Sequence, residues 1–287
     1  MLWKKNATLI YTLKLLKKTF ALFILLSGFN WLQAQRFTRD QINDSIREIS
    51  YFSNHLDNYF IVGAPINKNI NSQTSNAKYQ VSFKQILTKE PLPFDTYVLL
   101  TYTQKAFWNI FEDSFPFRDL NFHPSISLGK FVFDKNEQLR GIASISIEHE
   151  SNGRDSIYSR SWNRLSAAYI TQLSPQTNIS LKIWLPFVSK EGNPDLLDYV
   201  GLGEINLEHK LISNKLSLAL RARKGLDFEY GSLRTRIYFN PFKRNIANQF
   251  LMVEWYLGQA ESLLDYRRSQ SMIRIGFVIK GKEFAWF

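Results

Sequence analysis

Apolar and polar side chains alternate along this chain in segments of about ten residues, and this alternation restricts the possible folds more than any other feature of the sequence. In residues 178–185 every second residue is Ile or Leu, and the residues between them are Asn, Ser, Lys and Trp. Similar segments occur at 79–84, 204–210, 216–221, 232–239 and 273–279. A period of two is that of a β-strand whose two faces meet different surroundings. The sequence therefore predicts an all-β protein.

The polar face of these segments distinguishes two all-β architectures. A soluble β-sandwich also shows alternation, but its polar face meets water and is free to vary, whereas here that face carries Arg, Lys, Glu, Asn or Ser in nearly every segment. A closed barrel explains both faces, because its lumen can hold paired charges and its outside can face lipid, and because closure leaves no unpaired strand edge. We predict an antiparallel transmembrane β-barrel of about 12 strands at residues 57–287, allowing about 9 to 11 residues for each strand.

Several aromatic residues lie close to the ends of the expected strands. Transmembrane barrels carry girdles of aromatic side chains where the wall meets the two membrane interfaces. We therefore expect interfacial positions for Tyr97, Trp108, Trp162, Trp184, Trp255 and Tyr256.

Residues 1–34 differ in composition from the rest of the chain. They contain five lysines and no acidic residue, followed by the apolar run Phe20–Leu26, and they end in Ala34. These are the parts of a secretory signal peptide, so we predict cleavage after Ala34. The alternative is an N-terminal anchor helix, but the apolar run is much shorter than the roughly 20 residues that span a bilayer.

Residues 35–56 form an N-terminal extension before the predicted barrel. Isoleucines at 42, 46 and 49 follow a helical spacing among polar and charged residues. This pattern predicts a short amphipathic helix or a flexible leader.

Charge and cysteine content narrow the classes of function. The formal net charge is +11, and loss of the five N-terminal lysines would leave +6, scattered through the expected strands. We therefore expect no nucleic-acid partner. The sequence has no cysteine, which excludes disulfides, thiolate metal sites and cysteine nucleophiles, and it leaves four histidines as the only imidazoles.

Three polar residues lie on the apolar faces of two consecutive expected strands. His149 and Ser151 share the apolar face of the first strand, and Asn163 lies on the apolar face of the next. A serine becomes nucleophilic when a histidine takes its proton, and an acceptor group holds that histidine in one tautomer. If the strands pair as a hairpin, the Asn163 carbonyl can accept from His149, which indicates a membrane-facing hydrolase. The alternative is a histidine at the polar fringe of a strand and an ordinary turn serine.

The same region carries a longer motif. Residues 149–154 read HESNGR and residues 159–164 read SRSWNR, and together they resemble the signature of the outer membrane phospholipase A family. Shorter matches are YTQK at 102–105, SFPFR at 114–118, NPD at 193–195 and ESLLDY at 261–266. The resemblance implies a bacterial outer-membrane barrel of about twelve strands that hydrolyses acyl ester bonds of phospholipids and lysophospholipids, with A1 and A2 specificity.

The resemblance also implies catalytic roles. Ser151 would be the nucleophile, His149 the base and Asn163 the residue that orients His149. The backbone N–H of Gly153 would serve the oxyanion hole.

Calcium is the implied cofactor, and a homodimer is the implied active form. The family's calcium ligands are backbone carbonyls in the active loop, which map to Arg154 and Ser159, and a serine of the partner subunit, which maps to Ser114. Hard oxygen ligands of this kind suit calcium.

Two other functions stay open from the sequence. The chain could be a catalytically silent outer-membrane barrel, either porin-like or structural. It could also be a soluble secreted esterase, which would remain in solution without detergent.

Overall fold

The computed structural model describes residues 37–188, 192–242 and 248–281. The expected signal peptide at residues 1–34, with its cleavage after Ala34, lies outside this part of the chain. None of the helices in the described ranges has the length and apolar character that crossing a membrane would require.

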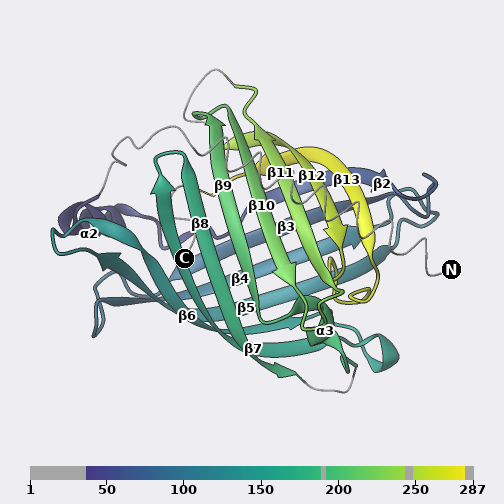
Figure 1. Cartoon of the computed structure of the whole chain (residues 1–287), viewed down its shortest axis with the longest axis horizontal. Helices are drawn as coiled ribbons and strands as arrows, with labels where there is room; N and C mark the ends of the chain where they lie inside the picture. The colour runs from purple at the N-terminus through teal and green to yellow at the C-terminus, as the bar shows by residue number, and fades with distance from the viewer. Residues whose placement is uncertain (1–36, 189–191, 243–247, 282–287) are drawn as a thin grey trace. The chain divides into compact units, whose positions relative to one another are not determined.

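The strands form one closed antiparallel barrel (Figure 1). They are β1 (Phe52–Asn54), β2 (Asn58–Pro65), β3 (Asn76–Ile86), β4 (Thr96–Trp108), β5 (Phe117–Phe133), β6 (Leu139–Ser151), β7 (Ser161–Ser174), β8 (Thr177–Val188), β9 (Gly203–Ile212), β10 (Leu216–Lys224), β11 (Gly231–Phe239), β12 (Gln249–Gly258) and β13 (Gln270–Ile279). Each strand from β2 onward pairs with its neighbours in the sequence, and β13 pairs with β2 to close the wall. The short β1 and β2 both pair with β3, at successive parts of its length, so together they occupy one strand position in the wall. The wall therefore has twelve strand positions, and the prediction of about 12 is confirmed.

The outward face of the wall is apolar. In β8, Leu181, Ile183 and Leu185 are each more than half exposed, while Trp184 between the last two is buried. A large surface of exposed isoleucine, leucine and phenylalanine side chains would be unstable in water and is the expected lipid-facing belt of a membrane barrel. The alternation therefore separates a lipid-facing outer surface from the interior, as the sequence predicts.

The lumen holds buried, mutually paired charges. Lys78 Nζ lies 2.8 Å from Glu254 Oε1 and 2.9 Å from Glu261 Oε1. Arg274 Nη1 lies 2.7 Å from Glu261 Oε1, and Arg236 Nη2 lies 2.7 Å from Glu254 Oε2. These side chains come from one continuous part of the wall, strands β3, β13, β12 and β11 with the β12–β13 loop, so they line this part of the lumen with ion pairs.

Four of the expected interfacial aromatic residues face the inside of the structure instead. They are Tyr97, Trp162, Trp184 and Tyr256, all of them buried. The girdle prediction is wrong for these residues because it relied on their closeness to strand ends and ignored the parity of the pleat. Trp162, for example, precedes the outward Asn163 and therefore points inward.

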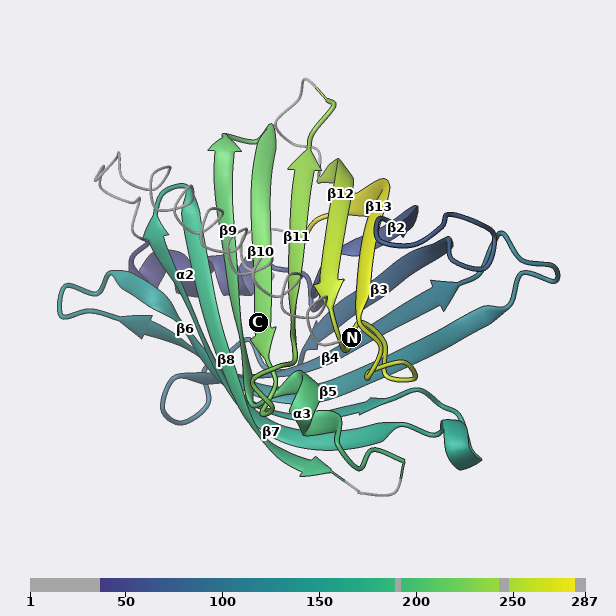
Figure 2. The same cartoon turned by 45° about the vertical axis from the view of Figure 1, so that its right-hand side comes forward.

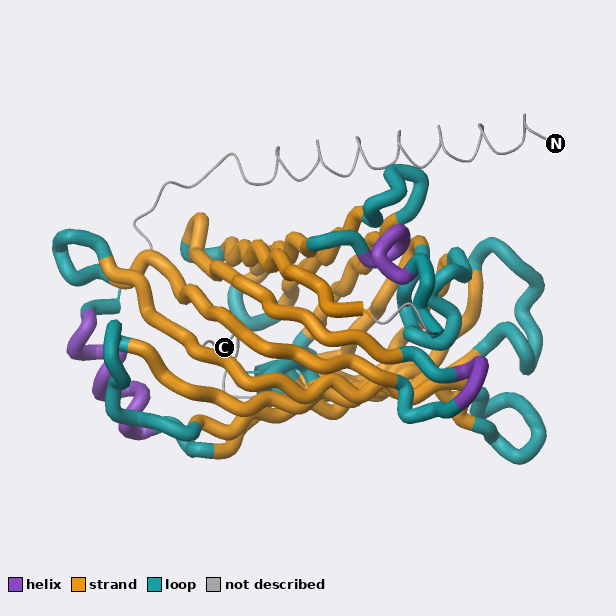
Figure 3. Tube along the Cα trace, turned by 90° about the horizontal axis from the view of Figure 1, so that it is seen from below, coloured by secondary structure: helices purple, strands orange, loops and turns teal. Residues whose placement is uncertain are grey.

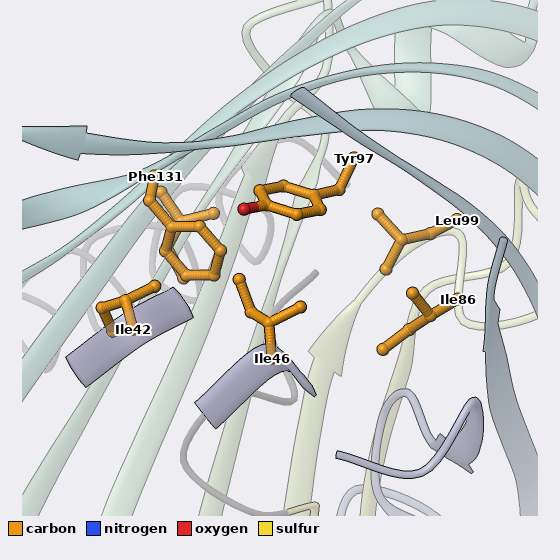
Figure 4. Packing of buried hydrophobic residues seen from close by; sticks show 7 residues of the cluster. Ile42, Ile46, Ile86, Tyr97, Leu99 and Phe131 are labelled. Atoms are coloured by element: carbon orange, nitrogen blue, oxygen red, sulfur yellow. The ribbon is translucent and has the colours of Figure 1, made fainter. Parts of the chain in front are cut away.

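A helix in the N-terminal extension, α2 (Arg39–Glu48), packs against one end of the barrel. Thr38 caps it, since its side chain accepts from the Gln41 N–H and the Gln41 side chain accepts from the Thr38 N–H. Ile42 and Ile46, four residues apart, share the buried face of the helix and contact the barrel (Figure 4). The buried barrel residues of this cluster are Ile86, Tyr97, Leu99, Phe131 and Ile142.

The opposite end of the barrel carries a second buried cluster. It includes α3 (Leu196–Val200) in the β8–β9 connection, and its buried members are Trp162, Trp184, Leu196, Val200, Leu263 and Tyr266. Figure 2 shows α2 and α3 at different ends of the strands, and Figure 3 shows loops and helices gathered at the two ends of the wall. Strand β6 runs from the α2 end to this second end, where it finishes at Ser151.

Candidate active site

The hairpin of β6 and β7 brings the predicted site residues to the second end of the barrel. His149 lies directly opposite Asn163, and Ser151 lies opposite Ser161. This is the strand pairing on which the sequence prediction depended. Ile147 and Leu165, which precede and follow the histidine and asparagine on the same face, are exposed on the outer wall. The pair is therefore part of the lipid-facing surface.

His149 and Asn163 form a hydrogen bond across this hairpin. The distance from His149 Nδ1 to Asn163 Oδ1 is 2.8 Å. A carbonyl oxygen can only accept, so the hydrogen is on Nδ1 and the lone pair is on Nε2. The asparagine thus holds the imidazole in the tautomer that a general base needs.

Ser151 lies on the same outward face, two residues beyond His149, and is half-buried. Among the hydrogen bonds of the described residues, none joins its hydroxyl to His149. A nucleophile and its base often approach fully only when substrate is bound. The structure brings the histidine and the asparagine into contact and leaves the serine next to them.

The inward side of the same hairpin carries an ion cluster centred on Glu148. Its carboxylate accepts from Arg164 Nε at 2.7 Å, lies 2.8 Å from His123 Nε2 and 2.5 Å from Lys182 Nζ. Arg164 also donates to Glu150 at 2.9 Å. Glu148 and Arg164 are themselves a cross-strand pair. If the strand register shifted by one residue, these charged side chains would face the lipid. The inner cluster therefore fixes the register of the outer pair.

The loop of residues 152–160 follows Ser151 and contains the short 3₁₀ helix η1 (Ser156–Tyr158). Gly153 has a φ of +62°, and a Cβ atom there would lie 2.9 Å from Phe122 Cε2. Both facts favour glycine at this position. Within the described residues the Gly153 N–H donates no hydrogen bond, so it is available to a negatively charged oxygen.

The expected calcium ligands are neutral oxygen atoms near this loop. The Ser159 carbonyl accepts from Arg160 Nη1 at 2.7 Å, whereas the Arg154 carbonyl and the Ser159 hydroxyl accept no hydrogen bond from the described residues. Ser114 is exposed in the β4–β5 loop and has a φ of +64°. No three acidic or histidine side chains of the described ranges gather into a metal site. The donor chemistry fits calcium with few protein charges, and hence with modest affinity.

Two of the shorter motifs from the sequence contact each other beside this loop. Asp195 of NPD accepts from the Tyr266 hydroxyl of ESLLDY and from Arg267, whose Nη2 lies 2.7 Å from Asp195 Oδ1. Burial and the hydrogen bond to Asp195 raise the pKa of Tyr266 to about 12, so its hydroxyl remains a donor at neutral pH. Burial opposes ionisation of Asp195, but the Arg267 and Tyr266 hydrogen bonds outweigh it and lower the pKa of that carboxyl. These motifs thus join the β8–β9 and β12–β13 loops.

The sequence patterns do not identify two buried polar residues at the 152–160 loop, one at its start and one beneath it. Asn152 bonds to atoms on both sides of the loop, and Asp119 of β5 lies beneath it. Asn152 directly follows the serine and begins a turn, which is a position where asparagine often bonds to backbone atoms. That signal was available, whereas the contact with Asp119 depends on folding.

The structure defines a transmembrane β-barrel of the outer-membrane type, with a hydrogen-bonded histidine and asparagine beside a serine on its outer wall. The sequence model of the phospholipase A1 family matches residues 43–279, so the chain belongs to this family of carboxylic ester hydrolases. The family resemblance seen in the sequence is confirmed. Together with the apolar belt, family membership makes this a multi-pass barrel of the bacterial outer membrane.

Known proteins of the same family are similar over most of the chain. A phospholipase A1 of Klebsiella pneumoniae is 28% identical over 215 residues, which are 73% of this chain and 72% of the relative. The outer membrane phospholipase A of Escherichia coli has a similar fold, with a TM-score of 0.73 and 22% identity over 84% of this chain and 97% of that one. An outer membrane phospholipase of Salmonella typhi, solved as a dimer with bound calcium, gives a TM-score of 0.72 and 22% identity over 85% and 99% of the two chains.

The inner cluster generates a prediction about stability. Glu148→Gln removes the negative charge that balances Arg164 and Lys182, and breaking a buried ion pair of this kind costs about 3 to 5 kcal/mol. We expect the free energy of unfolding, measured by denaturant titration of the barrel in lipid vesicles, to fall by about that amount. Glu229→Gln, on an exposed loop, is the matched control and should leave the free energy unchanged. Equal stability of the two variants would contradict the role of the inner cluster.

Proposed function

We propose that this protein is a calcium-dependent outer-membrane phospholipase that hydrolyses acyl ester bonds of phospholipids and lysophospholipids at either position, with Ser151, His149 and Asn163 as its catalytic triad. The hydrogen bond between His149 Nδ1 and Asn163 Oδ1 on the outer wall carries the proposal. It prepares a base two residues away from an outward serine.

The proposed reaction follows from this tautomer. His149 Nε2 takes the proton of the Ser151 hydroxyl while Oγ attacks the ester carbonyl, and the Gly153 N–H donates to the oxygen that becomes negative. His149 then returns the proton to the leaving alcohol, which departs as lysophospholipid and leaves an acyl group on Ser151. A water molecule, deprotonated by His149, releases the fatty acid by the same steps.

The position of the site suits a substrate that is already in the membrane. Ile147 and Leu165 are exposed beside the His149–Asn163 pair, so acyl chains in the bilayer contact the wall there. Substrate would therefore arrive along the plane of the membrane, and the lumen would take no part in binding it.

Asparagine, rather than aspartate, suits a site of this kind. An ionised carboxylate without a cationic partner is costly in a poorly solvated place, whereas a neutral amide can orient the imidazole without that cost. We expect the amide to stabilise a protonated His149 less than a carboxylate would.

Calcium would be held by the Arg154 carbonyl, by Ser159 and by Ser114 of the partner subunit. Bound there, it would add positive charge that stabilises the developing oxyanion. Two features support this assignment: the donor atoms are hard oxygens, and a relative of similar fold was solved as a dimer with bound calcium. Because one ligand would come from the partner subunit, the calcium site would be complete only in the homodimer.

The silent-barrel and soluble alternatives fit the structure less well. An open porin needs a water-filled lumen, but here buried ion pairs around Glu254 and Glu261 and the buried rings of Trp162 and Trp184 occupy the interior. A soluble esterase would expose the entire apolar belt to water.

The triad generates a direct prediction. Ser151→Ala and His149→Ala should each lower the release of fatty acid from phospholipid, in detergent with calcium, by at least about a thousandfold, because the nucleophile and its base act as one unit. Ser144→Ala, on the inward face of the same strand, should keep full activity. Substantial hydrolysis by either triad variant would refute the assignment.

The calcium assignment generates a second prediction. In the wild type, chemical cross-linking of the dimer and hydrolysis should rise together as calcium is added, because the same ion joins the two subunits. Ser114→Ala should shift both curves to higher calcium, and Ser72→Ala in another exposed loop should shift neither. Hydrolysis that saturates while cross-linking stays at its calcium-free level would contradict the shared site.

A further inference from the structure

We propose that Asn152 and Asp119 are positioning residues that hold the 152–160 loop, and with it the Gly153 N–H, in place beside Ser151. The inference rests on the proposed function for its catalytic consequence. Its structural part, that these two residues anchor the loop to the barrel and to the β12–β13 loop, stands on separate contacts.

Asn152 closes the loop from its base. Its Oδ1 accepts from the Arg160 N–H at 2.9 Å and from the Arg154 N–H at 3.4 Å, and its Nδ2 donates to the Tyr158 carbonyl at 2.9 Å. Its backbone N–H donates to the Arg160 carbonyl at 3.0 Å. One side chain, 3% exposed, thus bonds to both ends and the middle of the loop.

Asp119 connects this clamp to the barrel wall. Asn152 Nδ2 lies 3.4 Å from Asp119 Oδ1, and the second carboxylate oxygen accepts from Asn121 Nδ2 at 2.7 Å and from the Leu264 N–H at 2.9 Å. The residue is fully buried. No salt bridge of the described residues includes it, so the three N–H donors are its direct partners. A buried carboxylate held in this way is costly to form and rigid once formed.

The same carboxylate fixes the β12–β13 loop. Besides the Leu264 N–H on Asp119, the Leu263 N–H donates to Asn121 Oδ1 at 3.2 Å. Arg118, next to Asp119, forms a two-point ion pair with Asp265, at 2.9 and 3.0 Å. The ESLLDY segment therefore contacts the β5 residues that support the 152–160 loop, through both backbone and side-chain groups.

The anchor matters because Gly153 directly follows Asn152. An oxyanion donor helps only when it points at the position where charge develops, and a displacement of about 1 Å can lower the rate about a hundredfold. Gly153 has no side chain to hold it, and its positive φ must be maintained by its neighbours. Asn152 and the wall beneath it supply that restraint.

Limited trypsin digestion of the full-length protein in detergent tests the anchor without reference to activity. The loop contains Arg154 and Arg160, and mass spectrometry locates cleavage at each. Asn152→Ala and Asp119→Asn should increase the rate of cleavage at these sites several-fold, because each removes a partner of the clamp. Asp227→Asn, in an exposed turn of the β10–β11 loop, should leave it unchanged.

Exchanging the two residue types tests the contact between Asn152 and Asp119. Asn152→Asp alone sets two carboxylates against each other and should loosen the loop, whereas adding Asp119→Asn restores one donor facing one acceptor. The double variant should be cleaved more slowly than Asn152→Asp. If it is not, or if Asn152→Ala is cleaved at the wild-type rate while circular dichroism shows a folded barrel, the anchor is refuted.

Kinetics test the catalytic consequence. Asn152→Ala should lower kcat about a hundredfold with KM near the wild-type value, because the oxyanion donor acts in the transition state. A loss confined to KM would refute the positioning role. A wild-type protein that is inactive in calcium would refute the proposed function instead, and trypsin digestion would still decide whether Asn152 and Asp119 hold the loop.

Discussion

The ion pairs inside the β6–β7 hairpin are the interactions on which the outer surface of this region depends. A strand pleat sends neighbouring side chains to opposite faces, so His149 can face lipid only while Glu148 faces the lumen. Glu148, Arg164 and Lys182 are stable inside because they satisfy one another, and they would be very costly in hydrocarbon. A slip of one residue therefore has a large energetic penalty. The lumen cluster thus holds the His149–Asn163 pair in register although neither residue touches it.

A site on the outer wall changes what the rest of the barrel has to do. The lumen needs no pocket, and buried charges and tryptophans fill it. At the site end Asp195 and Tyr266 join the β8–β9 and β12–β13 loops, and Asp119 of β5 bonds to the β12–β13 loop and to Asn152. This packing supports the 152–160 loop. The barrel thus acts as a rigid support that presents the polar side chains of the site to the membrane.

Much of this arrangement follows from the period of the sequence. Alternation predicts the barrel, the lipid-facing side of His149, Ser151 and Asn163, and their meeting if the strands pair as a hairpin. Alternation does not determine the register of the strands, since that depends on which lumen charges meet across them. The same parity predicts an inward Trp162, whereas closeness to a strand end predicts an interfacial position, which is wrong for this residue. Contacts such as Asp119 with Asn152 join distant loops, and no local pattern specifies them.

The central claim is that the histidine–asparagine pair on the outer wall activates Ser151. A long-chain alkyl fluorophosphonate, which reacts with activated serines, tests this most directly when the modified residue is located by mass spectrometry in the detergent-solubilised protein with calcium. The account predicts a single adduct on Ser151 in the wild type and a strong loss of labelling in His149→Ala. Absence of an adduct, or labelling of Ser151 that is unchanged in His149→Ala, would contradict it.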